Sequence, residues 1–511
     1  MATEVLRAET AALVAEIHVR AGEAAPAGGL LITTELMKMR HELRAPYPCR
    51  VEAVHVAAGD ALTGGEPLAT LARIDVAAAP ETAEASTAPR ADLAELEARR
   101  ALLADAARPE AVAKRHALGL RTARENVADL FDPGSFVEYG AFAVAAMRRA
   151  RPLEDLQART QADGIVTGVG TVGGRPVAAM AVDYMVLAGT QGFNHHRKMD
   201  RLIEVARRDA LPIVLFAEGG GGRPNDGDVA EIMAAWLNVT SFRHFAAHPG
   251  PKIGIAAGYC FAGNAALYGV CDLRVATERS FVGMGGPAMI EGGGLGRVAP
   301  EEVGPSAVQG ANGVHDLIVA DEAAAVAAAK TLLALNEPTT PAPGDDEALR
   351  AIVPEDRGID YDMRAAIVAL VDGGAFLELR RGFGAGLVCG FGRIEGRAVG
   401  IVANNPLHLG GAIDAAAGDK GARHLQLCDR WGLPVVTLCD TPGFMVGPAV
   451  EETGQVAHVS RLFLAGAHFS QPLVTVILRK AYGLGAMAMA GGGFDRPALC
   501  CAWPSGEVGA M

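Results

Sequence analysis

A short stretch near the start of the chain, Met37-Lys38-Met39, places a lysine between two methionines. A lysine amine can be modified covalently or can bind an anion, provided that solvent reaches it. Most of the chain's positive charge comes from arginine, which makes this lysine stand out. Its chemistry depends on whether the surrounding residues hold it at the surface.

An internal repeat encloses this lysine. Residues 17–33 align with residues 54–70 at a constant offset, and in both copies a glycine is followed by an acidic residue at the same place. Each copy reads as a strand, a turn and a second strand. The repeat predicts a small β barrel or sandwich over residues 1–75, with Lys38 exposed at the tip of the hairpin that joins the copies.

Two glycine-rich turns further along could stabilise developing negative charge. One turn, Gly219-Gly220-Gly221-Gly222, follows an apolar strand, and the other, Gly483-Leu484-Gly485-Ala486, follows a second apolar strand. Glycine at a strand-to-helix turn allows backbone N–H groups to converge at a helix N-terminus, which is the geometry of an oxyanion hole. A phosphate-binding turn or a tight structural turn has the same pattern.

A larger repeat organises the remainder of the chain. Residues 168–183 align with residues 390–405 at an offset of 222, and Leu211-Pro212-Ile213-Val214 aligns with Leu433-Pro434-Val435-Val436 at the same offset. Strands alternating with helices and short glycine turns predict βαβ units in an α/β fold. The predicted helices are 196–209 and 418–431, and the predicted strands are 213–217 and 435–439. Glu218 and Asp440 end equivalent strands and are expected to fix turns.

Composition separates the repeats into domains. Val76 to Arg90 is rich in Ala, Pro, Thr and Glu without periodicity, which is typical of a tether, and we place a flexible linker at 76–95. The Pro-rich acidic segment 336–356 is the expected hinge of the larger repeat. The predicted domains are therefore 96–340 and 341–511.

Charge and cysteine content exclude several classes of protein. The net charge is −13 at pH 7, which argues against general binding to nucleic acid. The eight cysteines form no CxxC pair, so we expect no metal site and a reducing, cytoplasmic location. The uncharged stretch Ile253 to Cys271 raises the question of a membrane span, but its glycines and Asn264 favour a buried strand-turn-helix.

The first repeat resembles the biotin carboxyl carrier (biotinyl) domain. The matching residues are Leu36-Met37-Lys38-Met39, Ala45-Pro46 and Gly59-Asp60, with departures at Leu36 and Cys49, where alanine and glycine are common in the family. The resemblance implies biotin attached covalently to Lys38 by a biotin ligase. The alternatives are an ordinary surface lysine and a lipoyl carrier of the same fold.

Residues 110–511 resemble the carboxyltransferase (β) subunit of the biotin-dependent acyl-CoA carboxylases. The resemblance rests on four motifs: Lys114 to Arg124 (KRHALGLRTAR), Leu130 to Phe136 (LFDPGSF), Asp440 to Phe444 (DTPGF) and Arg479 to Gly483 (RKAYG). It implies an α/β fold of two tandem crotonase-like (ClpP/crotonase) carboxyltransferase domains, preceded by the small all-β biotinyl barrel-sandwich.

The resemblance also implies a reaction. Carboxyl transfer from carboxybiotin on Lys38 to the α-carbon of a short acyl-CoA, such as acetyl-CoA or propionyl-CoA, needs donors for two oxygens and no side-chain base. By motif, Gly219 and Gly220 would hold the enolate oxygen, and Gly485 and Ala486 the biotin ureido oxygen. Cations at the start of the first predicted helix could meet CoA phosphates: Arg197, Lys198 and Arg201.

The implied partners are a separate biotin carboxylase subunit, a biotin ligase and further copies of this chain in a dimer or hexamer. One alternative is the α subunit of a membrane-associated acyl-CoA decarboxylase. Another is a non-catalytic biotin carrier or assembly subunit, because the chain stops at Met511 where the family continues into further helices, so that the last domain is expected to be truncated. A plain crotonase-type hydratase is disfavoured by Lys38.

Overall fold

The computed structural model describes residues 3–74, 90–224, 226–229, 239–356 and 358–509. The chain forms two compact units, Met1–Ala94 and Glu95–Met511, which we describe separately. Most of the predicted linker lies outside the described residues. Its last residues, 91–95, begin a helix, α1 (Ala91–Ala101).

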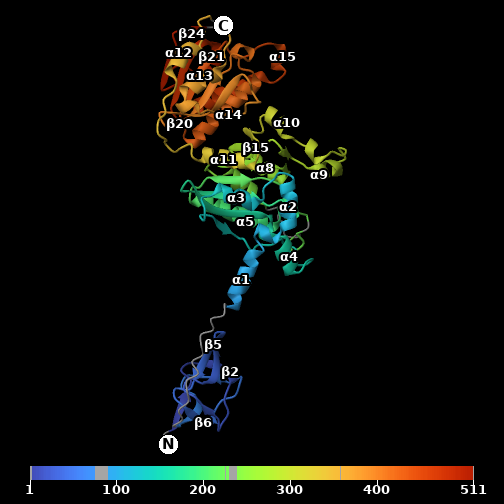
Figure 1. Cartoon of the computed structure of the whole chain (residues 1–511), viewed down its shortest axis with the longest axis vertical. Coiled ribbons are helices and arrows are strands. Elements are labelled where there is room, and N and C mark those ends of the chain that lie inside the picture. The colour runs from blue at the N-terminus through green and yellow to red at the C-terminus, as the bar shows by residue number, and fades with distance from the viewer. Residues whose placement is uncertain (1–2, 75–89, 225, 230–238, 357, 510–511) are drawn as a thin grey trace. The chain divides into compact units, whose positions relative to one another are not determined.

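The first unit consists of two four-stranded sheets with a core between them (Figure 1). Their orders are β1-β8-β6-β3 and β5-β4-β2-β7. The small all-β domain predicted from the first repeat is confirmed, since β2–β4 and β6–β8 are its two copies. The strands are β1 (Thr3–Arg7), β2 (Ala12–Ile17), β3 (Ala24–Ala25), β4 (Leu30–Leu36), β5 (Met39–Arg44), β6 (Cys49–Val54), β7 (Ala61–Leu62) and β8 (Pro67–Arg73).

The second unit contains two large sheets, one from each half of the larger repeat. The first has the order β17-β15-β13-β12-β11-β10-β9 and is parallel from β11 to β17. Its strands are β9 (Val137–Tyr139), β10 (Ile165–Val172), β11 (Arg175–Val182), β12 (Ile213–Phe216), β13 (Lys252–Ala256), β15 (Leu273–Thr277) and β17 (Leu317–Val319). A small sheet, β14 (Tyr259–Phe261) with β16 (Phe281–Gly283), lies beyond its carboxyl edge.

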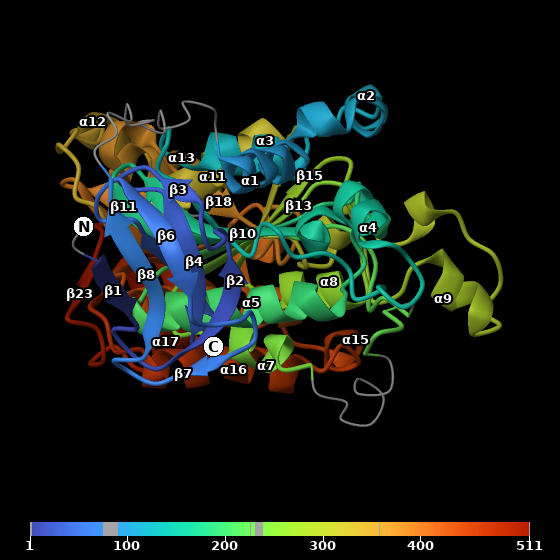
Figure 2. The same cartoon turned by 90° about the horizontal axis from the view of Figure 1, so that it is seen from below.

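The helices of this half are α2 (Pro109–Ala117), α3 (Ala123–Leu130), α4 (Leu153–Arg159), α5 (Phe193–Arg208), α7 (Ser241–Ala246), α8 (Gly263–Gly269), α9 (Pro287–Gly292), α10 (Ser306–Ala311) and α11 (Glu322–Leu333). Of these, α3, α5, α8, α10 and α11 contact strands of the first sheet. Figure 2 shows α5 along its length with α7 beside it. The stretch 253–271 is β13, β14 and α8, so the predicted strand-turn-helix is confirmed. Among the described residues, no helix combines the length and hydrophobicity that a membrane crossing requires.

The second sheet repeats the first. Its order is β18-β19-β20-β21-β22-β23, with β24 also paired to β22. Its strands are β18 (Leu377–Leu379), β19 (Leu387–Ile394), β20 (Arg397–Asn404), β21 (Val435–Thr441), β22 (Leu473–Tyr482), β23 (Leu499–Ala502) and β24 (Glu507–Gly509). Its helices are α12 (Asp346–Ile352), α13 (Met363–Leu370), α14 (Ala415–Trp431), α15 (Pro448–Glu451), α16 (Gln455–His468) and α17 (Gly483–Met489).

The antiparallel hairpins of the two halves agree closely. The bounds of β10 and β11, raised by 222, are those of β19 and β20. An aspartate binds the tip of each hairpin. Asp132 accepts hydrogen bonds from the N–H groups of Gly173 (3.0 Å) and Gly174 (2.8 Å). Asp372 accepts the equivalent bonds from the N–H groups of Glu395 (3.0 Å) and Gly396 (2.6 Å). The internal duplication predicted from the sequence is therefore confirmed, and one hydrophobic core runs through both halves.

Candidate functional site

Lys38 lies at the tip of the β4–β5 hairpin, as predicted. Met37 (φ 50°) and Lys38 (φ 67°) both adopt left-handed backbone, which is the geometry of a two-residue type I′ turn. Met37 is 90% exposed and Met39 is 66% exposed, so the lysine projects from an apolar tip into solvent. An exposed primary amine on a rigid turn fits covalent attachment of biotin through an amide bond.

The first glycine-rich turn follows β12, and its first two N–H groups hold the turn together. Gly219 (φ 93°) packs against the backbone of Gly189, and its N–H donates to Tyr259 O (2.6 Å). The Gly220 N–H donates to Ala188 O (3.2 Å). The motif predicted that these two N–H groups bind the enolate. In the structure they are engaged by the protein itself.

The next two glycines are better placed to donate outward. Gly221 is half-buried and Gly222 is exposed. Within the part of the chain that the structure describes, no hydrogen bond engages the N–H of either residue. The usable donors of this turn therefore lie one or two residues after the pair predicted from the motif.

Asn264, at the start of α8, holds this turn in place through hydrogen bonds of its side chain. The sequence did not predict this role. It is completely buried, and its amide nitrogen donates to the carbonyls of Glu218 (2.8 Å), Gly220 (2.6 Å) and Gly189 (3.0 Å). Its amide oxygen accepts from Gln191 (2.8 Å). Because the Gly220 carbonyl is held by Asn264, the N–H of Gly221, on the opposite side of the same peptide plane, points away from Asn264.

Replacing this amide tests its role. Asn264→Asp keeps the shape but sets one carboxylate oxygen against three carbonyl oxygens, and we expect a loss of about 3 kcal/mol in the free energy of unfolding. Chemical denaturation measures the loss. Asn312→Asp, at an exposed position, is the matched control and should change stability by less than about 0.5 kcal/mol. Equal stability of the two variants would show that Asn264 does not hold the turn.

Buried ion pairs anchor the strands that lead into both turns. Arg115 on α2 donates to both carboxylate oxygens of Glu218 (2.9 and 2.6 Å). In the second half, Arg479 donates to Asp440 (3.0 Å). Both carboxylates are buried and paired with arginine, which agrees with the expectation that they fix turns.

The second glycine-rich turn opens helix α17 at the end of β22. Gly485 packs against the Gly443 backbone so closely that an added Cβ would lie 2.6 Å from the Gly443 carbonyl carbon. The first N–H groups of a helix have no partner within it. Leu484 is 61% exposed, whereas Ala486 is completely buried. Gly485 and Ala486, the two predicted donors, are both buried, and Leu484 is the exposed residue of the turn.

The predicted CoA-binding cations separate into two groups on α5. Arg197 and Arg201 are exposed, and Arg201 pairs with Glu204 (2.8 Å). Lys198 is buried, and its Nζ donates to the carbonyls of Ala162 (2.9 Å) and Ile165. The prediction is wrong for Lys198, because the amphipathic period of the helix turns this residue inward, where backbone carbonyls satisfy it.

Burial gives Lys198 a measurable pH signature. Desolvation lowers its pKa from 10.5 to about 8. Between these values the folded chain has released a proton that the unfolded chain still holds, so the free energy of unfolding rises with pH. We expect it to rise more steeply from about pH 8 to 10 in the wild type than in Lys198→Met, measured by denaturation at each pH. Parallel curves would contradict the burial of this charge.

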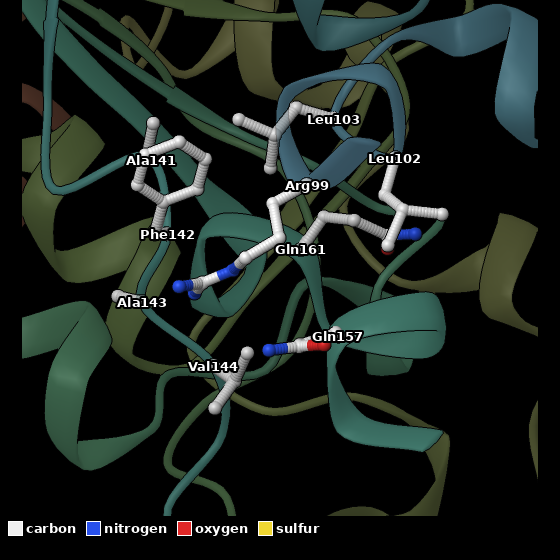
Figure 3. Close-up of a pocket in the computed structure, with 9 residues that line it drawn as sticks. All are labelled: Arg99, Leu102, Leu103, Ala141, Phe142, Ala143, Val144, Gln157 and Gln161. Atoms are coloured by element: carbon white, nitrogen blue, oxygen red, sulfur yellow. The ribbon is translucent and has the colours of Figure 1, made fainter. Parts of the chain in front are cut away.

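The small hollow shown in Figure 3 has no catalytic features. It has a volume of about 10 Å³ and lies between the end of α1 and the segment 141–144. Its only charged lining residue, Arg99, stacks over the ring of Phe142 at 4.8 Å. Among the described residues, no group of His, Cys, Asp or Glu is arranged to hold a metal ion.

Two family models match the chain. The carboxyl transferase domain matches residues 114–511, and the model described as biotin-requiring enzyme matches residues 3–71.

Curated relatives match over most of the chain. The methylmalonyl-CoA carboxyltransferase 12S subunit of Propionibacterium freudenreichii subsp. shermanii is 34% identical over 78% of this chain and 77% of its own length. The propionyl-CoA carboxylase beta chain of Saccharopolyspora erythraea is 34% identical, covering 78% and 76%. The methylmalonyl-CoA decarboxylase subunit alpha of Veillonella parvula is 31% identical, covering 78% and 80%.

Solved structures agree with these relatives. A single-chain, multi-domain long-chain acyl-CoA carboxylase is 48% identical with a TM-score of 0.79, and the match covers 100% of this chain but only 52% of that protein. The transcarboxylase 12S hexamer is 32% identical with a TM-score of 0.74, covering 83% and 84%. The chain therefore belongs to the carboxyltransferase family of the biotin-dependent acyl-CoA carboxylases and carries a biotinyl domain at its N-terminal end.

Proposed function

We propose that this chain transfers a carboxyl group between biotin carried on Lys38 and the α-carbon of an acyl-CoA. Two features of one chain carry the proposal. One is an exposed lysine on the hairpin of the biotinyl domain, and the other is a glycine-rich turn at the carboxyl edge of each of the two large sheets. The antiparallel hairpin that leads into a parallel sheet in each half supports a crotonase-like fold for both domains.

The chain's own part in the reaction is to stabilise negative charge. Gly221 and Gly222 are proposed to donate to the thioester oxygen as the enolate forms, while Gly219, Gly220 and Asn264 hold the turn. Leu484 and Gly485, at the start of α17, are proposed to donate to the ureido oxygen of biotin. Biotin, when attached, supplies the activated carboxyl group. Backbone donors do not titrate, and losing one typically lowers the rate by about 100-fold or more.

We propose a long-chain acyl group for the substrate. The sequence led us to expect acetyl-CoA or propionyl-CoA. The 48% identity over the whole chain with the solved long-chain acyl-CoA carboxylase supports this proposal, whereas curated long-chain and propionyl-CoA relatives are equally identical, at 34%. Initial rates of carboxylation with acetyl-, propionyl- and palmitoyl-CoA distinguish a short-chain from a long-chain substrate preference. Arg197 and Arg201 remain candidates for CoA phosphate contacts.

The partners follow from the same proposal. We propose that biotin is attached by a biotin ligase and carboxylated by a separate biotin carboxylase, since the two family models that match this chain are a biotin-requiring and a carboxyl transferase model. We propose a homo-oligomer, as in the transcarboxylase 12S hexamer, and a cytoplasmic location.

The transferase domains can be tested without the carrier domain by a half-reaction, in which the carboxyl group passes from a carboxylated acyl-CoA to free biotin. The purified full-length chain is mixed with free biotin and with malonyl-CoA, methylmalonyl-CoA or an α-carboxylated palmitoyl-CoA, and loss of the carboxylated thioester is followed by chromatography. We expect biotin-dependent conversion to the acyl-CoA. No conversion with any thioester would contradict the proposed activity and favour a carrier or assembly subunit.

A decarboxylase subunit is the second candidate, favoured by the 31% identity with the Veillonella decarboxylase subunit alpha. Both directions use the same donors. Net carboxylation by the chain with a biotin carboxylase, ATP and bicarbonate would support the first candidate. Turnover that requires a membrane fraction would support the second.

A further inference from the structure

A cluster of buried charges lies where the two halves of the repeat meet, and it includes no residue of the glycine-rich turns. Asp316, next to β17, accepts hydrogen bonds from Arg274 Nε (3.2 Å), Arg380 Nε (2.8 Å) and Arg423 Nη2 (3.5 Å). Arg274 belongs to the first half, and Arg380 and Arg423 belong to the second. One carboxylate thus serves three guanidinium groups across the domain junction.

Lys420 adds a fourth cation to this cluster. It lies on α14, is 1% exposed, and its Nζ makes no hydrogen bond among the described residues. Arg380 is 7% exposed, and its Nη2 also lacks a hydrogen-bond partner there. Both residues line one cavity of about 10 Å³, together with Asp316, Arg423 and His424.

The duplication supplies a reference for Lys420. Its equivalent in the first half, at the same offset of 222, is Lys198. Both are buried lysines at the same place on equivalent helices. Lys198 donates to two backbone carbonyls, whereas Lys420 donates to none. The duplicated backbone therefore does not explain how the second lysine is satisfied.

Neighbouring groups do not balance the charge. Glu378 is held by Arg364 in two hydrogen bonds (2.8 and 2.6 Å). Burial keeps His424 neutral by lowering its pKa to about 3, and keeps the Cys389 thiol protonated by raising its pKa to about 11. Four cations against one carboxylate leave an excess of positive charge, and a buried charge without a partner is strongly destabilising.

We propose that this cavity binds one small inorganic anion, of the size of chloride, held by Lys420 Nζ, Arg380 Nη2 and Arg423. Such an ion offsets the excess charge and links the two transferase domains. A volume of about 10 Å³ leaves room for a single small particle, which excludes a phosphate or an organic carboxylate.

Halide-dependent stability is the first test. Thermal unfolding of the full-length chain is compared in sodium chloride and in sodium gluconate of equal ionic strength. Because the ion binds only the folded chain, we expect chloride to raise the midpoint by about 2 °C or more. Lys420→Met should lose this difference, and the matched variant Lys198→Met should keep it. Equal midpoints of the wild type in both salts would overturn the proposal.

Crystallography of the wild type provides a test that does not depend on a variant folding. Crystals grown in sodium bromide are measured at the bromine absorption edge. We expect an anomalous peak within hydrogen-bonding distance of Lys420 Nζ. Density for water alone at that position, without anomalous signal, would overturn the proposal.

Discussion

Replacing Lys38 by arginine is expected to abolish biotin attachment and all carboxyl transfer that uses the chain's own carrier. Only a primary amine can form the amide bond, and the guanidinium of arginine keeps the charge without that reactivity. Co-expression with a biotin ligase, followed by intact mass and an avidin blot, measures the adduct. A coupled assay with a biotin carboxylase should fall to background, a loss of about 100-fold or more.

Two controls separate the carrier from the transferase. Lys114→Arg, at another exposed lysine on α2, should keep the full adduct. The half-reaction with free biotin should proceed in Lys38→Arg as in the wild type, since the transferase domains are untouched. A biotin adduct on Lys38→Arg would show that another residue is modified.

Adding one methyl group at Gly485 is expected to lower the turnover of the half-reaction by about 100-fold. The new Cβ would lie 2.6 Å from the Gly443 carbonyl carbon and 2.8 Å from the Phe444 nitrogen. Both are backbone atoms, so the first turn of α17 must shift and carry its N–H groups out of position. The rate constant at saturating free biotin and thioester measures the effect.

The control for this variant is the same substitution without the clash. At Gly269, at the end of α8, an added Cβ would meet no other atom within 4 Å. Gly269→Ala should leave turnover within about twofold of the wild type, since it removes no interaction. Wild-type turnover in Gly485→Ala would show that α17 does not bind a reacting group.

The repeats allowed much of the fold to be predicted, because strand periodicity and glycine turns are local properties of the sequence. The helix expected at 418–431 is α14, Ala415–Trp431, and the strand expected at 213–217 is β12, Ile213–Phe216. The hairpin at Lys38 was predictable because it joins the two copies, one of which ends at residue 33 and the other of which begins at residue 54.

The free donors of the site could not be predicted, because long-range contacts decide them. The motif indicated Gly219 and Gly220, but their N–H groups donate to carbonyls of residues 259 and 188. Asn264 likewise became informative only when α8 was placed beneath the turn. Lys198 lies in a run of basic residues, and the run alone does not show which member faces inward.

The core shared by the two halves also affects how the chain leaves the ribosome. Leu332 and Leu335 pack in a cluster that includes Trp431, and Asn336 bonds to the Trp431 carbonyl across a separation of 95 residues. At about 5–20 residues per second, synthesis of that separation takes roughly 5–20 seconds. During this interval the nascent first half presents an uncovered apolar face, which makes it a substrate for chaperones until its duplicate has been translated.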